Sequence, residues 1–92
     1  MIKSFRSPEA EALFNDRPAA RFRSIERPAR RKLLYLGQAR TIQDLLVPPG
    51  NRLEALVSDR KGQHRIRISD QFRVCFVWTT LGPKDVELVD YH

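Results

Sequence analysis

Arginines in two neighbouring alternating segments are the residues of this chain best suited to chemistry. Arg67 alternates with Ile66 and Ile68, and Arg73 lies in the next segment, beyond a turn at residues 69–71. This three-residue turn places Arg67 directly opposite Arg73 in an antiparallel hairpin. Two facing cations destabilise a sheet by up to about 1 kcal/mol, but together they suit a phosphodiester. The pair therefore predicts a phosphate-binding site.

The following hairpin adds a tyrosine to these arginines. The alternating pattern favours a register with Cys75 opposite Val89, which sets Tyr91 opposite Arg73. We therefore expect Arg67, Arg73 and Tyr91 in one row across three strands, on the sheet face away from the core. Taken singly, each residue is more often an ordinary surface residue. The row as a whole favours a phosphate-binding site.

The elements that must position this row indicate an α+β fold in a single domain, residues 1–92. We expect a short strand at residues 1–5, followed by a helix capped by Ser7 that stops between Asn15 and Pro18. A second helix opens at Ser24, and a further helical turn follows Thr41. Period-two alternation then predicts four strands, at residues 53–57, 65–68, 72–78 and 86–89. Short connectors favour an antiparallel meander with the helices packed on one face.

The charge of the chain favours an anionic partner. Its 92 residues include 17 Lys and Arg against 11 Asp and Glu, a net charge of +6. Most of the cations are arginines, whose planar fork suits phosphate, so nucleic acid is favoured over a membrane surface. Residues 17–40 carry eight basic residues against the single acid Glu26, a net charge of +7. This segment is either a docking surface or a solvated helix face.

Cysteine and histidine are too few for several classes of site. The single cysteine, Cys75, excludes a disulfide within the chain. One Cys and two His do not make up a usual zinc site, so we expect neither a metal nor another cofactor. The sequence has no apolar run long enough to span a membrane and no signal-peptide core at its start, which favours the cytoplasm.

Several motifs give the chain a family resemblance. They are PPGNRLEAL at residues 48–56, GQH at 62–64, IRI at 66–68, DQFRVCF at 70–76 and VELVDYH at 86–92. Together with MIKSF at residues 1–5, they resemble the HigB toxins, or plasmid maintenance killer proteins, of the RelE-like superfamily. The resemblance covers nearly the whole chain, and it implies the RelE-like microbial ribonuclease fold.

The resemblance also implies an activity and partners. HigB toxins are ribosome-dependent messenger-RNA endonucleases that need no metal, because the RNA 2′-hydroxyl attacks the adjacent phosphate. The implied partners are the ribosome, messenger RNA and a HigA-type helix-turn-helix antitoxin, through which the toxin meets operator DNA only indirectly. Arg73 matches the family's catalytic arginine, with Arg67 beside it. Tyr91 matches a catalytic or base-stacking tyrosine, and His92 could move a proton through its imidazole or its terminal carboxylate.

Other residues are assigned to binding or to a second rank. The predicted RNA- or ribosome-binding residues are Arg21, Arg23, Arg27, Arg30, Arg31, Lys32, Arg60, Lys61 and Arg65. His64 and Asp90 are second-rank candidates, and strand alternation places His64 on the apolar face. Val57 and Ser58 replace commoner family residues, which predicts a slow or mild toxin.

Two other functions compete with the endonuclease. A non-catalytic RNA- or ribosome-binding module would use the same arginines only to hold backbone phosphate. Direct recognition of DNA is disfavoured, because the sequence has no helix-turn-helix pattern.

Overall fold

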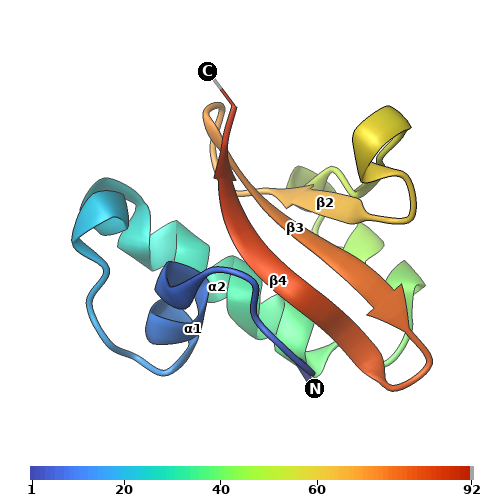
Figure 1. Cartoon of the computed structure of the whole chain (residues 1–92), viewed down its shortest axis with the longest axis horizontal. Coiled ribbons are helices and arrows are strands. Elements are labelled where there is room, and N and C mark those ends of the chain that lie inside the picture. The colour runs from blue at the N-terminus through green and yellow to red at the C-terminus, as the bar shows by residue number, and fades with distance from the viewer. Residues whose placement is uncertain (92) are drawn as a thin grey trace.

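A four-stranded antiparallel sheet with two helices against one face makes up the fold (Figure 1). The computed structural model describes residues 1–91. The helices are α1 (Pro8–Phe14) and α2 (Glu26–Gln38). The strands are β1 (Glu54–Ala55), β2 (His64–Arg67), β3 (Phe72–Thr79) and β4 (Gly82–Asp90), and they follow one another across the sheet in this order. The predicted α+β fold with an antiparallel meander is confirmed.

Short 3₁₀ helices connect these elements. They are η1 (Ala20–Ile25), η2 (Ile42–Leu46), η3 (Pro49–Asn51) and η4 (Ser58–Arg60). None of the helices within residues 1–91 combines the length and the apolar character that crossing a membrane requires.

Helix α1 begins where the sequence predicts it. The Ser7 hydroxyl accepts a hydrogen bond from the Ala10 N–H at 3.0 Å, and Pro8 occupies the first helical position. Helix α2 begins at Glu26 rather than at Ser24, because Ser24 belongs to η1, whose path is kinked at Phe22. The predicted turn after Thr41 forms as η2, where Asp44 accepts the backbone N–H groups of Arg40 and Thr41.

The expected N-terminal strand is reduced to a single bridge. Phe5 pairs in parallel with Val86, and the Lys3 N–H donates to the Pro83 carbonyl at 2.7 Å. The first residues therefore run along the free edge of β4 and cover it without forming a regular strand (Figure 1). Covering this edge satisfies backbone groups that would otherwise remain open to another chain.

The core lies between the sheet and the helices. Leu33 and Leu36 of α2 are completely buried in the same cluster as Ile66, Val74 and Phe76 of the strands. These strand residues have even numbers, so the odd-numbered residues of β2 and β3 point to the other face of the sheet. This alternation decides which side chains are available to a site.

The strand registers confirm one prediction and correct the other. Between β2 and β3, Arg67 pairs with Arg73, as expected. Between β3 and β4, Arg73 pairs with Val89 rather than with Tyr91, and Cys75 pairs with Glu87 rather than with Val89. The reason is a tight turn at residues 80–81, so β4 begins at Gly82, earlier than the prediction assumed. A bulge between Cys75 and Val77 then sets the final register.

Candidate functional site

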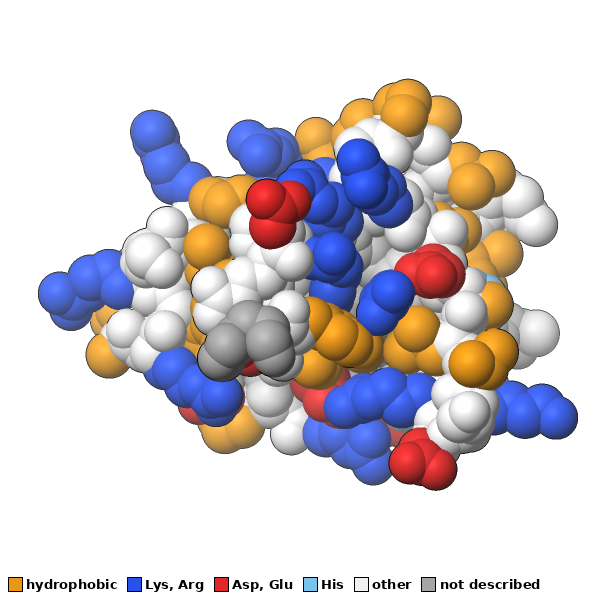
Figure 2. Space-filling view, turned by 90° about the horizontal axis from the view of Figure 1, so that it is seen from above, with side chains coloured by type: hydrophobic (Ala, Val, Ile, Leu, Met, Phe, Trp, Pro, Cys, Tyr) orange, Lys and Arg blue, Asp and Glu red, His pale blue; other side chains and the backbone are white. Residues whose placement is uncertain are grey.

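The face of the sheet away from the helices carries the predicted arginines. Arg65 and Arg67 come from β2, Arg73 from β3 and Glu87 from β4. Figure 2, which views the molecule from the end at which β4 finishes, shows Lys and Arg side chains gathered in a band across the middle of the surface. A surface of this sign attracts a polyanion.

Arg73 is a half-buried cation that the backbone holds in place. Its Nη1 donates to the backbone carbonyls of Ser69, Asp70 (3.2 Å) and Phe72 (3.0 Å), which fixes the guanidinium over the turn. Burial, together with the charges of Arg65 and Arg67, lowers the pKa of Arg73. Within residues 1–91 no carboxylate lies at ion-pair distance from it. A fixed positive charge of this kind is ready to accept an anion.

Arg67 lies opposite Arg73 but has a partner of its own. Its Nη2 forms an ion pair with the Asp70 carboxylate, three residues further along the chain. The hydrogen bond from Arg67 holds the pKa of Asp70 below its ordinary value. Asp70 therefore compensates the Arg67 charge by direct contact, whereas it acts on Arg73 only from beyond ion-pair distance.

Tyr91 lies against Arg65 rather than in the predicted row. The Arg65 Cζ is 4.8 Å from the centroid of the Tyr91 ring, and the Tyr91 hydroxyl is 3.7 Å from the Cys75 sulfur. Glu54 holds Arg65 from the other side, at 2.6 Å from its Nη2. The contact with Tyr91 is the largest cause that raises the pKa of Arg65, and the contact with Glu54 raises it further. The shifted register causes this difference. It also places Arg65 between Tyr91 and Glu54, a position that sequence reasoning missed.

A pocket of about 400 Å³ opens beside this stack. Its walls are β1, the residues that follow β1, helix η4, Arg65 and Tyr91. Val57, 76% exposed, is one of the lining residues. Pockets of about this volume suit a small organic group such as a nucleotide.

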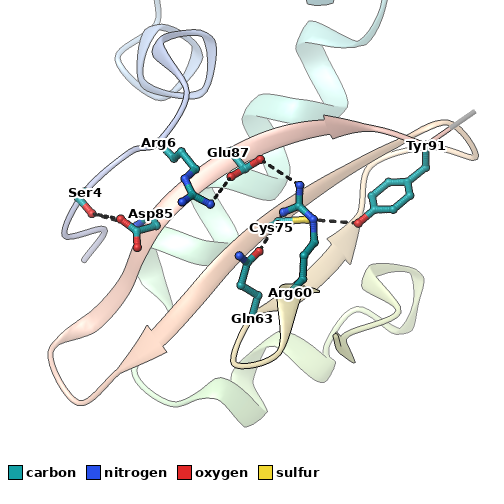
Figure 3. Close-up of polar contacts among 8 residues, drawn as sticks. All are labelled: Ser4, Arg6, Arg60, Gln63, Cys75, Asp85, Glu87 and Tyr91. Atoms are coloured by element: carbon teal, nitrogen blue, oxygen red, sulfur yellow. Dashed lines mark hydrogen bonds and ion pairs between the residues drawn. The ribbon is translucent and has the colours of Figure 1, made fainter. Parts of the chain in front are cut away.

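Arg60 reaches the same pocket from η4. Its Nη1 donates to Gln63 Oε1 at 3.0 Å, and its Nη2 lies 3.6 Å from the Glu87 carboxylate. Glu87 also contacts Arg6 at 3.4 Å (Figure 3). Cys75 lies beside this group, completely buried, and burial raises the pKa of its thiol.

Lys32 does not belong to a binding surface, which corrects its predicted role. The residue is only 7% exposed, and its Nζ donates to Asn51 Oδ1 at 2.6 Å. Burial is the largest cause that lowers the pKa of Lys32, and the charge of Arg31 lowers it further. Its position on the buried stripe of α2 directs the side chain inward, so the ammonium group is not available to RNA.

The other predicted residues lie at several places. Arg30 is paired with Glu26 at 3.0 Å and with Asp16 at 3.6 Å. The His64 ring stacks on Phe76, which confirms its place on the apolar face. The Asp90 carboxylate accepts a hydrogen bond from Gln71. Among the predicted binding residues, those exposed to solvent are Arg21, Arg23, Arg27, Arg31 and Lys61. His92 lies outside the described residues.

Sequence reasoning also missed Glu87 and Gln63. Both contact Arg60, and the only available signal was that Glu87 shares the odd-numbered face with the arginines. Residues 1–91 contain no group of three or more His, Cys, Asp or Glu side chains placed to hold a metal ion.

Comparison with known proteins gives the family. The sequence model of the HigB-like toxins, described as the RelE-like toxin of the type II toxin–antitoxin system HigB, matches residues 3–92. Toxin HigB-1 of Vibrio cholerae serotype O1 is 46% identical over 55 residues, which are 60% of this chain and 58% of that protein. The alignment thus spans less than two thirds of this relative. Since the family model covers nearly all residues of the chain, the chain belongs to the HigB-like toxins, which are RelE-like toxins of type II toxin–antitoxin systems.

Proposed function

We propose that this toxin is a ribosome-dependent messenger-RNA endonuclease that acts in the cytoplasm and cleaves through the RNA 2′-hydroxyl without a metal. The main support is Arg73, a half-buried guanidinium that is fixed by backbone carbonyls and has no carboxylate partner within residues 1–91. Such a group is preorganised for the charge that develops on a phosphate during cleavage.

The proposed reaction is an internal transfer at phosphorus. The 2′-oxygen forms a bond to the adjacent phosphorus as it loses its proton, and the bond from phosphorus to the 5′-oxygen breaks. The leaving 5′-oxygen takes up a proton, so the products carry a 2′,3′-cyclic phosphate and a 5′-hydroxyl. In this scheme Arg73, with Arg67 opposite it, binds the non-bridging oxygens on which negative charge accumulates.

The proposed role of Tyr91 is to stack on a nucleobase. Its hydroxyl is directed to the Cys75 sulfur at 3.7 Å, and one side of its ring is held by Arg65. Aromatic side chains commonly hold unpaired RNA bases by stacking. His92 remains the predicted group for proton transfer, through its imidazole or its terminal carboxylate.

The decisive experiment compares variants by cleavage of messenger RNA. Arg73→Ala is expected to lower kcat about 10²- to 10³-fold, because it removes one preorganised donor from the transition state. Purified toxin would be incubated with ribosomes and messenger RNA, and the newly formed 5′-hydroxyl ends would be counted. Lys84→Ala, which removes an exposed cation near the turn after β3 that belongs to no proposed binding surface, is the control and should cleave like the parent.

Folded Arg73→Ala protein that cuts as fast as the parent would remove Arg73 from the reaction. The same assay separates the second candidate function, a non-catalytic RNA- or ribosome-binding module. The observed register favours this alternative, because Arg73 pairs with Val89 and the Tyr91 hydroxyl contacts the Cys75 sulfur instead. A parent that blocks translation without forming new RNA ends would support it.

We further propose that the partners are the ribosome, messenger RNA and a HigA-type helix-turn-helix antitoxin. The family description supports an antitoxin, since a type II system pairs its toxin with one. The exposed arginines of residues 17–40 support docking to ribosomal RNA or to an acidic surface of the antitoxin. Co-purification with the product of the neighbouring gene tests this part.

A further inference from the structure

Glu87 is an acid on the face of the sheet that carries the site arginines. Its side chain is only 14% exposed and lies between Arg6 and Arg60 (Figure 3). A carboxylate at this position repels RNA phosphates, so simple electrostatics makes it unfavourable for a surface that binds nucleic acid. Its presence suggests a task that outweighs this repulsion.

Arg60 both contacts Glu87 and lines the pocket. The residue comes from the short helix η4, and its side chain is 36% exposed. Gln63 Oε1 and Glu87 Oε1 hold two ends of its guanidinium, at 3.0 Å and 3.6 Å. An unrestrained arginine side chain loses much rotamer freedom when it binds a ligand, and these two contacts remove part of that cost in advance. The guanidinium has five N–H donors, so it can bind a phosphate while both contacts persist.

Arg6 provides an internal comparison. It contacts the same carboxylate at 3.4 Å, but it comes from the N-terminal segment, is 59% exposed and does not line the pocket. Arg60 does line the pocket, together with Arg65 and Tyr91. The two arginines therefore share an acid and differ in whether they reach the pocket.

We propose that Glu87 is a positioning residue that holds Arg60 at the wall of the pocket, where the guanidinium binds a backbone phosphate of the RNA adjacent to the phosphate at Arg73. This inference rests on the proposed function for the identity of the ligand. Glu87 itself does not touch the RNA. It acts through the orientation of Arg60.

The sign of the effect of Glu87→Gln separates positioning from simple electrostatics. Removing a negative charge from an RNA-binding face should tighten binding if charge alone matters. If Glu87 positions Arg60, the same change weakens binding, by about three- to fivefold. Arg60→Ala should weaken it about tenfold, the usual effect of losing one charge-assisted contact. Arg6→Ala should stay within about twofold of the parent.

Binding would be measured with ribosomes carrying messenger RNA, with every variant in an Arg73→Ala background so that the RNA is not consumed. The double variant Glu87→Gln/Arg60→Ala should bind no more weakly than Arg60→Ala alone, because the acid has nothing left to position. Arg60→Lys tests the geometry while retaining the charge, and its affinity should lie between those of the parent and Arg60→Ala.

In the cleavage-competent protein, Glu87→Gln should raise KM and leave kcat unchanged, which a general loss of stability does not do. Unchanged or tighter binding by Glu87→Gln would overturn the proposal, as would an Arg6→Ala effect as large as that of Arg60→Ala. A parent that forms no new RNA ends would refute the proposed endonuclease. The binding comparison would still decide the role of Glu87.

Discussion

Lys32 and Asn51 show how a single buried contact can reverse the assignment of a residue. Asn51 is completely buried, accepts from the Lys32 Nζ and donates to the Leu45 carbonyl at 3.1 Å. From the sequence, Lys32 is one of eight cations in a basic segment. Its partner lies 19 residues away and beyond a change of direction in the chain. No local pattern predicts this pairing, so the sequence could not separate Lys32 from its exposed neighbours.

Asn51→Ala should therefore destabilise the protein. It leaves the Lys32 ammonium and the Leu45 carbonyl buried without their partner, at an expected cost of about 2 to 3 kcal/mol in the free energy of unfolding. Urea denaturation measures this change. Lys32→Met combined with Asn51→Leu should recover part of the loss, because it removes both polar groups together.

Asn15→Ala is the control, because Asn15 makes its hydrogen bond to the Glu11 carbonyl at an exposed site. Its effect should stay below about 1 kcal/mol. Equal urea midpoints for Asn51→Ala and the parent would contradict the structural role of Asn51.

The strands show which features of an element can be predicted. Alternation correctly predicts that Ile66 and Val74 face the core, because side-chain direction has a period of two. Register depends instead on turn length. A three-residue turn gives the observed Arg67–Arg73 pair, whereas the alternation predicts no strand at residues 80–85 although β4 already begins at Gly82. The pairing of Arg73 with Arg67 was therefore predictable, and the contact of Tyr91 with Arg65 was not.

Gly82→Ala tests the contact of the N-terminal segment with the hairpin. Gly82 has a φ of 123°, and an added Cβ would lie 2.3 Å from the Met1 backbone oxygen. Because both strain and backbone collision oppose the substitution, we expect a loss of about 2 kcal/mol or more in the free energy of unfolding. The loss would be measured by urea denaturation.

Two other glycines separate these causes. Gly62 has a φ of 94° but open space around it, so Gly62→Ala should show only the strain, at about 1 kcal/mol. Gly50 has neither a collision nor a positive φ, and its substitution should be nearly neutral. If Gly82→Ala and Gly62→Ala prove equally stable, the collision with Met1 is irrelevant.

The whole molecule has a net charge of +6, and its cations lie in different environments. Arg27 and Arg31 of α2 are exposed, whereas Arg30 between them is engaged by Glu26 and Asp16. The composition predicts an anionic partner but does not show which cations are open to it. The proposed site uses the arginines of the sheet, and docking is the proposed role of the exposed arginines of residues 17–40.

The salt dependence of ribosome binding should reflect this division. Log affinity falls with log salt, and each phosphate contact contributes about 0.9 to the steepness of this fall. Replacing Arg27 and Arg31 together by Ala should therefore make the slope shallower by about 2. Arg30→Ala should change the slope little and reduce thermal stability instead, because its partners belong to the protein. Titrations at several salt concentrations provide the measurement. A slope unaffected by the Arg27 and Arg31 changes would assign this helix face to another partner.

A bulge in β4, where Asp85 and Val86 lie opposite the single residue Phe76, divides the last hairpin into two halves that keep separate registers. On one side Arg73 pairs with Val89, and on the other Val77 pairs with Lys84. A bulge can take up or release one residue without moving the pairs beyond it. A one-residue insertion or deletion in the turn after β3 can therefore be absorbed there. We therefore expect the arginines at the other end of the sheet to keep their register when the hairpin tip is changed by one residue.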